Sequence, residues 1–105
     1  MTTVKMTVSE NDIFFECVNH ANSHDECIMY STLCNVLVSA VLPHGIMPKV
    51  YEPGHVIIVA HKYAESVLAV FHAVWATFVE LRSQYNGVKL IGVDDFNFHD
   101  KEKSV

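Results

Sequence analysis

The stretch "VNHANSHDECIMYSTLC" (18–34) marks a change from one kind of structure to another. Its first part is polar and rich in Asn, His and Asp, a composition typical of a loop. From Glu26 to about Leu42 the residues are mostly apolar and suit a helix, which Pro43 ends and Gly45 follows. The stretch therefore joins a loop of ionisable side chains to the start of a helix.

On either side of this stretch, the pattern of residues predicts strands and a second helix. Alternating β-branched and apolar residues indicate strands, and polar positions at helical spacing within a long apolar run indicate a helix. The expected strands cover 3–8, 13–18, 46–51, 55–60 and 88–93, and the second helix covers about 63–84. Pro53 and Gly54 fit a type II turn between the third and fourth strands.

The resulting order, β-β-α-β-β-α-β, predicts an α+β two-layer sandwich in which two helices pack on a mainly antiparallel sheet. A chain of 105 residues is long enough for one domain, which we expect to cover 1–93 and to be followed by a charged tail, 94–105. The second helix is apolar around most of its circumference. We therefore expect one side of it to meet the sheet and another to meet a partner, as in a homodimer.

Composition limits the classes of partner and compartment. The formal net charge of -5, with Lys clustered only in "HDKEKSV" (99–105), disfavours binding to nucleic acid and favours a protein or peptide partner. Three cysteines without the spacing of a disulfide scaffold indicate a reducing cytoplasm, and "MTTVKMTVSEND" (1–12) lacks a signal core. The apolar run from Cys27 to Leu42 is shorter than the ~20 residues of a membrane span, so no membrane partner is expected.

The residue types around the helix start suit nucleophilic catalysis. His20 follows the second strand and Cys27 lies in the first helical turn, where the helix N-terminus and an imidazolium both favour a thiolate. Asp25 could orient the His20 ring, as the third member of a triad does. Ser31 shares the helix face of Cys27 and could donate to an oxyanion or to the thiolate. Cys34 lies further into the apolar part of the helix and is interpreted as a core residue.

Two other interpretations of the same residues stay open. Cys17, His20, His24 and Cys27 form the pattern C-x2-H-x3-H-x2-C, whose side chains zinc accepts. The strand pattern turns Cys17 towards the core, however, and no glycine permits a tight knuckle, so we expect neither a metal nor a cofactor. Alternatively, "SHDE" (23–26) is simply a capping box, and its two acids oppose ionisation of the thiol beside them.

Several motifs together resemble the ribosomal-processing cysteine proteases. "NHA" (19–21), "DEC" (25–27) and Ser31 resemble that family's pair of catalytic motifs, a Gly-His-Ala at a strand end and a helix-borne Cys. "PGHVIIVA" (53–60) resembles its second hairpin, and "ELRSQYNGVKL" (80–90) resembles its helix end, turn and last strand. The order of elements agrees as well, so the resemblance extends over most of the expected domain.

The resemblance implies a dimeric endopeptidase that trims an N-terminal extension from a large-subunit ribosomal protein, or, if the chain is encoded by a phage, processes a phage structural protein. By position, His20 would be the general base and Cys27 the nucleophile, with Asp25 and Ser31 as supporting residues. The implied location is the bacterial cytoplasm, which for a phage protein is that of the host.

Three positions depart from the family pattern. Asn19 stands in place of glycine, only six residues separate His20 from Cys27, and Asp25 lies two residues before the cysteine rather than three. These departures support an alternative function, that of a catalytically impaired relative acting as a protein-binding or inhibitory (anti-defence) dimer.

Overall fold

The computed structural model describes residues 1–19, 23–85 and 87–94 of the chain. Its order of elements is the predicted β-β-α-β-β-α-β, with a short 3₁₀ turn, η1, after the first helix. The elements are β1 (Thr2–Val8), β2 (Asp12–Val18), α1 (His24–Val41), η1 (Leu42–His44), β3 (Val50–Glu52), β4 (His55–His61), α2 (Glu65–Gln84) and β5 (Val88–Asp94). Asp94 ends β5, and the rest of the expected tail, 95–105, lies outside the described residues.

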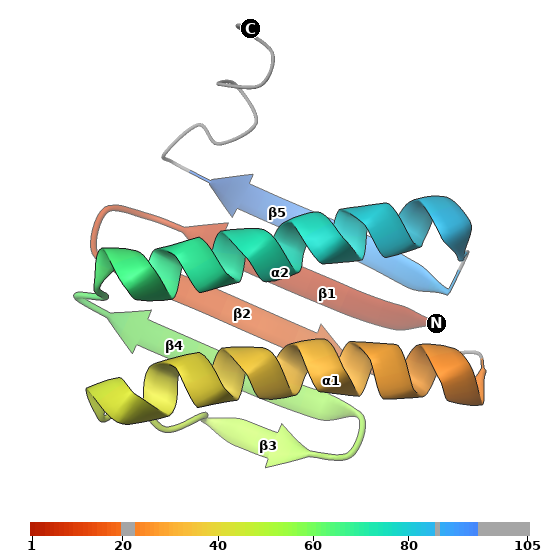
Figure 1. Ribbon diagram of the computed structural model, residues 1–105, viewed down its shortest axis with the longest axis horizontal. Coiled ribbons are helices and arrows are strands. Elements are labelled where there is room, and N and C mark those ends of the chain that lie inside the picture. Colours follow the sequence, from red (N-terminus) through yellow and green to blue (C-terminus); the bar gives the residue numbers. More distant parts are fainter. Residues whose placement is uncertain (20–22, 86, 95–105) are drawn as a thin grey trace, which may run out of the picture.

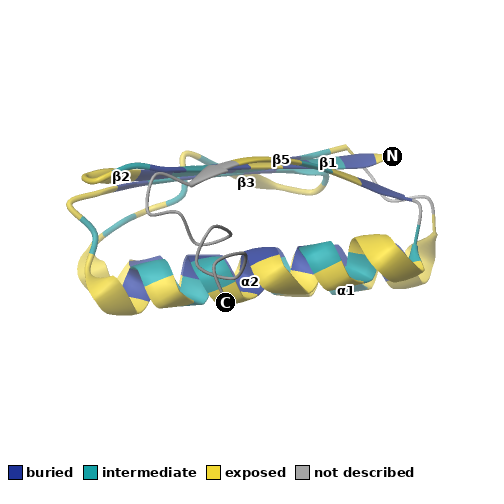
Figure 2. Cartoon of the chain, turned by 90° about the horizontal axis from the view of Figure 1, so that it is seen from above, coloured by how far each residue is buried: buried dark blue, intermediate teal, exposed yellow. Residues whose placement is uncertain are grey.

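The strands form one sheet in the order β3-β4-β2-β1-β5. β1 and β5 run parallel, while the other three neighbouring pairs are antiparallel. Both helices lie on the same side of this sheet (Figure 1), and the view along the layers separates sheet from helices (Figure 2). The predicted two-layer α+β sandwich with a mainly antiparallel sheet is therefore confirmed.

The core follows from the alternation of residues along the strands. Every second residue of β2 faces the helices and is buried, whereas the residues between them are partly exposed. Phe15 at the centre of this strand packs against Phe71 and Phe78 of α2, with ring centroids 6.3 and 6.4 Å apart. Fully burying a side chain of this size contributes about 1.5–3 kcal/mol, so this aromatic cluster holds α2 on the sheet.

The third strand is shorter than predicted. The sequence predicts a strand over 46–51, but β3 covers only Val50–Glu52. Pro48 has no N–H to donate, and pairing with β4 begins after it, where the Lys49 N–H donates to the Ile57 carbonyl at 2.8 Å. Gly54 has φ +79, as the second central residue of a type II turn requires.

The first helix ends where the sequence predicted, to within one residue. α1 ends at Val41 with Leu42 as its C-cap, and Pro43 then lies inside η1. Gly45 then closes the turn with φ +77, and its N–H donates to the Leu42 carbonyl.

Among the described residues, the segment His24–His44 is long and apolar enough to cross a membrane. A helix that covers the sheet of a soluble protein meets the same criteria, and α1 packs on the sheet here, so length and composition alone do not indicate a span.

Candidate functional site

The start of α1 is held by Ser23. Its hydroxyl oxygen accepts a hydrogen bond from the Glu26 N–H at 3.2 Å, and its carbonyl accepts one from the Cys27 N–H at 3.0 Å. This is the N-cap expected from the sequence, although the Glu26 carboxylate bonds to Tyr30 instead of returning to Ser23. Cys27 therefore lies in the first turn of a well-capped helix.

Glu26 and Tyr30 form a buried pair one turn apart on α1. The Tyr30 hydroxyl donates a hydrogen bond to the Glu26 carboxylate at 3.1 Å. Tyr30 is only 3% exposed and Glu26 only 8%. Burial and the hydrogen bond to Glu26 together raise the pKa of Tyr30 to about 12. Of the two acids that precede Cys27, Glu26 thus points into the protein, while Asp25 is exposed.

The end of β2 is anchored at Asn19. Its N–H donates to the Gly54 carbonyl at 2.9 Å, and its own carbonyl accepts a bond from the Thr2 hydroxyl at 3.4 Å. Asn19 has φ +77, in the left-handed region where asparagine is one of the few tolerated residues other than glycine. The asparagine that replaces the family's glycine therefore keeps the backbone conformation that glycine would favour. His20 follows directly and lies outside the described residues.

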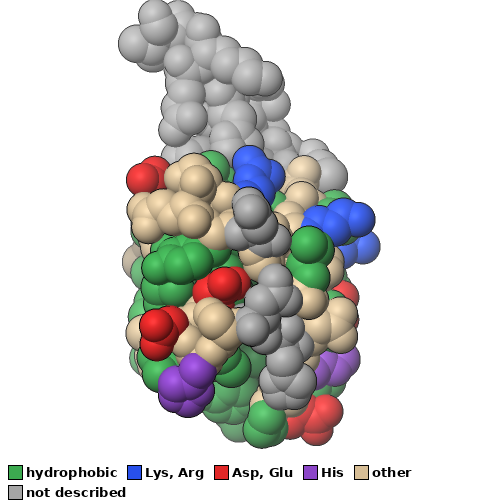
Figure 3. Space-filling model, turned by 90° about the vertical axis from the view of Figure 1, so that its right-hand side faces the viewer, with side chains coloured by type: hydrophobic (Ala, Val, Ile, Leu, Met, Phe, Trp, Pro, Cys, Tyr) green, Lys and Arg blue, Asp and Glu red, His purple; other side chains and the backbone are tan. Residues whose placement is uncertain are grey.

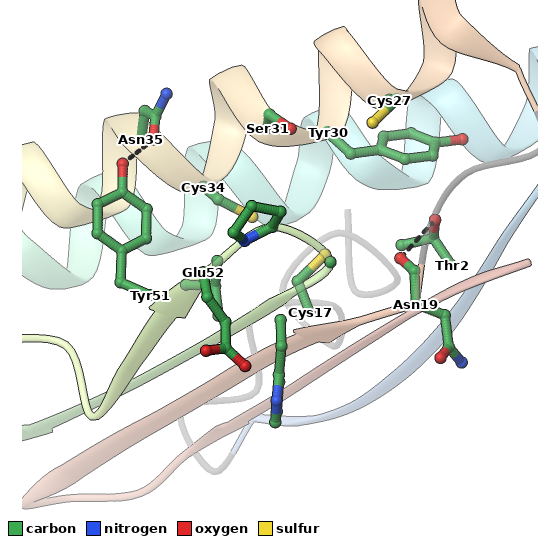
Figure 4. Close-up of a pocket in the computed structure, with 14 residues that line it drawn as sticks. Thr2, Cys17, Asn19, Cys27, Tyr30, Ser31, Cys34, Asn35, Tyr51 and Glu52 are labelled. Atoms are coloured by element: carbon green, nitrogen blue, oxygen red, sulfur yellow. Dashed lines mark hydrogen bonds between the residues drawn. The ribbon is translucent and has the colours of Figure 1, made fainter.

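A pocket with a volume of about 290 Å³ opens between α1, the end of β2 and the β3–β4 hairpin (Figure 4). Cys27 and Ser31 line it from α1, one turn apart, as their spacing predicted. Asp25 does not line it, so of the three predicted site residues that the structure describes, two come together here, Cys27 and Ser31. The pocket wall also includes Glu52 from the hairpin.

Two further cysteines, Cys17 and Cys34, line the same pocket. The sequence placed both in the core, and both are indeed buried in the hydrophobic cluster, at 8% and 3% exposure. A hydrogen bond from the Cys34 thiol lowers the pKa of Cys17, and the same bond, together with burial, raises the pKa of Cys34. Two sequence signals could have placed these cysteines on the pocket wall. Cys17 alternates with inward-facing residues of its strand, and Cys34 lies seven residues from Cys27 on the same helix face.

A second contact ties the hairpin to α1. The Tyr51 hydroxyl donates to the Asn35 side-chain oxygen, and both residues line the pocket (Figure 4). Asn35 is two turns beyond Cys27 on α1, so this contact closes the end of the pocket away from the helix start. The pocket is thereby bounded at one end by Tyr51 and at the other by Asn19.

Besides the thiols and the Tyr hydroxyls, the ionisable side chains on the pocket wall are a glutamate and a histidine. Among the described residues, Glu52 and His55 line the pocket and no Lys or Arg does. The His55 Nε2 lies 3.0 Å from a Glu16 carboxylate oxygen, which gives that histidine a partner outside the pocket. The end of the molecule that carries the start of α1 shows acidic and histidine side chains over its lower half (Figure 3). This charge pattern favours a neutral or basic ligand.

The zinc interpretation gains no support from the described part of the chain. Within those residues, no group of three or more His, Cys, Asp or Glu side chains is placed to hold a metal. His20, which the C-x2-H-x3-H-x2-C pattern requires, lies outside them.

Neither a protein-family model nor a curated protein matches the sequence. The structure does match the crystal structure of an essential ribosomal processing protease, Prp, from S. aureus, in complex with a covalently linked product peptide. The match has a TM-score of 0.67 and covers 88% of this chain and 99% of that one, at 20% sequence identity. This chain has the fold of a ribosomal processing protease. A hypothetical protein from Staphylococcus aureus matches over the same shares of both chains, with a TM-score of 0.62 and 16% identity.

The likeness to Prp confirms, at the level of the fold, the resemblance predicted from the motifs. Sequence identities of 20% and 16% support a common fold and leave the chemistry to be argued from this chain's own residues. In this chain α1 follows β2, and Cys27 in its first turn lines the pocket.

Proposed function

We propose that this protein is a cysteine endopeptidase, a divergent relative of the ribosomal processing proteases, with Cys27 as nucleophile and His20 as general base. The observation that carries the proposal is the position of Cys27: it lies in the first turn of α1 and lines a pocket, within the fold of a processing protease. Ser31 lines the same pocket one turn further along the helix.

The proposed reaction begins with transfer of the Cys27 thiol proton to His20. The thiolate attacks the backbone carbonyl carbon of the substrate, and the carbonyl oxygen becomes an oxyanion. The Glu26 and Cys27 N–H groups already donate hydrogen bonds to Ser23. The donors left for this oxyanion are therefore the Ser31 hydroxyl and the earlier N–H groups of the first helical turn. His20 then protonates the leaving amine, and water hydrolyses the thioester.

The proposed substrate is a short segment of a specific protein, either the extension of a ribosomal protein or a phage structural protein. The S. aureus Prp structure contains a product peptide, which supports a peptide ligand for this fold. A pocket bordered by Glu52 and without Lys or Arg among its described residues favours a segment with basic or neutral side chains. We place the enzyme in the cytoplasm as a homodimer that binds neither nucleic acid nor membrane.

Alkylation of the purified protein tests the assignment of Cys27. The rate of Cys27 modification by iodoacetamide, followed by mass spectrometry across pH, should exceed that of a free thiol at neutral pH and fall in His20→Ala. His44→Ala is the matched control, because His44 is exposed in η1 and away from the pocket wall. A rate equal to that of free cysteine, unchanged by His20→Ala, would contradict the proposal.

A second candidate function is a protein-binding or inhibitory dimer that no longer cleaves. It is favoured by the exposed position of Asp25, off the pocket wall, and by the six residues between His20 and Cys27. Cys27→Ala separates the two functions, because cleavage requires the thiol and binding does not. A biological effect that survives this substitution assigns the protein to the binding class.

A further inference from the structure

In the pocket that Cys27 lines, two other thiols extend towards each other from different layers of the fold. Cys17 rises from the inner face of β2, and Cys34 descends from α1 (Figure 4). Their thiols share a hydrogen bond, and both line the pocket. These two side chains therefore link the sheet and α1 within the pocket that the candidate nucleophile also lines.

We propose that Cys17 and Cys34 are an oxidation site: a hydroperoxide converts them into an intramolecular disulfide that joins β2 to α1 and restricts access to Cys27. The inference goes beyond the proposed cleavage activity and does not depend on it. It rests on the placement of the two thiols and on the pocket that exposes both of them to a small oxidant.

The chemistry balances with the hydroperoxide as the only oxidant. The Cys17 thiolate attacks one peroxide oxygen, the O–O bond breaks, and the other oxygen leaves as an alcohol, or as water from hydrogen peroxide. Cys17 is then a sulfenic acid. The Cys34 sulfur attacks the Cys17 sulfur, the Cys34 proton and the hydroxyl leave as water, and the S–S bond forms. Two electrons from the two thiols reduce one peroxide.

The environment of the pair assigns the order of these steps. The hydrogen bond from Cys34 lowers the pKa of Cys17, which favours Cys17 as the thiol that reacts with peroxide. Cys34 keeps its proton and is the resolving thiol. A pocket volume of about 290 Å³ admits hydrogen peroxide, although both side chains are buried against bulk solvent.

Cys27 is not the partner of Cys34. The two are seven residues apart on one helix, which places their Cα atoms roughly 10 Å apart at ~1.5 Å per residue. A disulfide requires Cα atoms within about 7 Å. The helix geometry therefore excludes a Cys27–Cys34 disulfide. Cys17, on the facing strand, is the cysteine whose thiol interacts with Cys34, which makes these two the proposed pair.

The disulfide has two measurable consequences. An S–S bond of about 2.05 Å is shorter than a hydrogen-bonded thiol contact, so its formation draws α1 and β2 together and narrows the pocket between them. Cys27, on the wall of that pocket, becomes less accessible. The cross-link also encloses residues 17–34, which include the loop and the helix start, and it reduces the entropy of the unfolded chain.

The experiment uses the full chain and counts thiols. Reduced protein is treated with hydrogen peroxide, quenched, denatured and alkylated, and its mass is measured. Of the three free cysteines, one should remain alkylatable after oxidation, and dithiothreitol should restore all three. Peptide mapping should find Cys17 linked to Cys34. Oxidised protein should also melt about 10 °C higher than reduced protein, and native Cys27 should react with iodoacetamide severalfold more slowly.

Three single variants serve as controls. Cys27→Ala should still lose two thiols on oxidation, whereas Cys34→Ser should stop at a sulfenic acid on Cys17, trapped with dimedone. Cys17→Ser should leave Cys34 reduced. Because a serine in the core could impair folding, circular dichroism first confirms that each variant is folded. The proposal is overturned if oxidised wild type keeps all three thiols, if the disulfide contains Cys27, or if Cys27 alkylation is equally fast in both redox states.

Discussion

The Tyr30 hydroxyl donates a hydrogen bond to the Glu26 carboxylate at 3.1 Å, inside the first turns of α1. The bond turns the acid that directly precedes Cys27 into the protein, whereas the sequence alone places that acid beside the thiol. Tyr30 itself lines the pocket that contains Cys27. The pair therefore links the stability of the helix start to the shape of the candidate site.

Tyr30→Phe should destabilise the protein by about 1–3 kcal/mol, because it leaves a buried carboxylate without its donor. Urea denaturation of wild type and variant measures the difference in the free energy of unfolding. Tyr51→Phe is the matched control: it also removes a tyrosine hydroxyl, but from a residue that is 55% exposed, so the loss should be under about 1 kcal/mol. Equal losses in the two variants would contradict the buried pair.

The same pair predicts a dependence of stability on alkaline pH. Folding raises the pKa of Tyr30 from 10.0 to about 12, so its contribution to stability is complete below pH 10 and is lost as the pH rises towards 12. Melting temperatures measured from pH 9 to 12 should therefore fall more steeply for wild type than for Tyr30→Phe. Parallel curves for the two proteins would show that Tyr30 titrates alike in the folded and unfolded states.

The effect of a substitution at Asn19 on stability should depend on the backbone conformation rather than on lost side-chain contacts. Because Asn19 has φ +77, Asn19→Gly should be neutral or slightly stabilising. Asn19→Val should lower the free energy of unfolding by about 1–2 kcal/mol, because β-branched residues avoid this region. Urea denaturation measures both. A valine variant as stable as the glycine variant would contradict the left-handed conformation at the entrance to the loop.

Gly92 on β5 has no room for a side chain. A Cβ there would lie 2.5 Å from the Trp75 ring, which is buried in the core, so Gly92→Ala should destabilise the protein by about 1–3 kcal/mol. Gly45→Ala separates this clash from backbone strain, because Gly45 has φ +77 but nothing within 4 Å of an added Cβ. Its cost should be about 1 kcal/mol. Thermal or urea unfolding of both variants provides the comparison.

Ser31→Ala should lower the rate of peptide cleavage by about 10–100-fold if its hydroxyl donates to the oxyanion. Ser39 is exposed on the same helix and does not line the pocket, so Ser39→Ala should leave the rate unchanged. Hydrolysis of a candidate ribosomal or phage segment, followed by mass spectrometry, measures both variants. An unchanged rate in Ser31→Ala would limit this serine to a structural role.

Much of the fold could be predicted because its signals are local. Alternation marked β1, β2 and β4, helical periodicity marked α1 and α2, and the capping sequence placed Cys27 in a first helical turn. The shortened β3 could not be predicted in the same way, since its pairing with β4 decides where it begins. Of the predicted site residues, Cys27 and Ser31 share one helix face and both line the pocket, Asp25 lies off its wall, and His20 lies outside the described residues.

The sequence by itself determined the order of elements, because the two periods of side-chain direction are properties of each segment alone. Only the tertiary structure decided that Cys17, on β2, interacts with Cys34, on α1, in the pocket that Cys27 also lines. It also decided that Glu26 turns inward to Tyr30. These contacts depend on which face of the sheet the helices cover and how closely they pack on it, and that is a result of burying apolar surface across the whole chain.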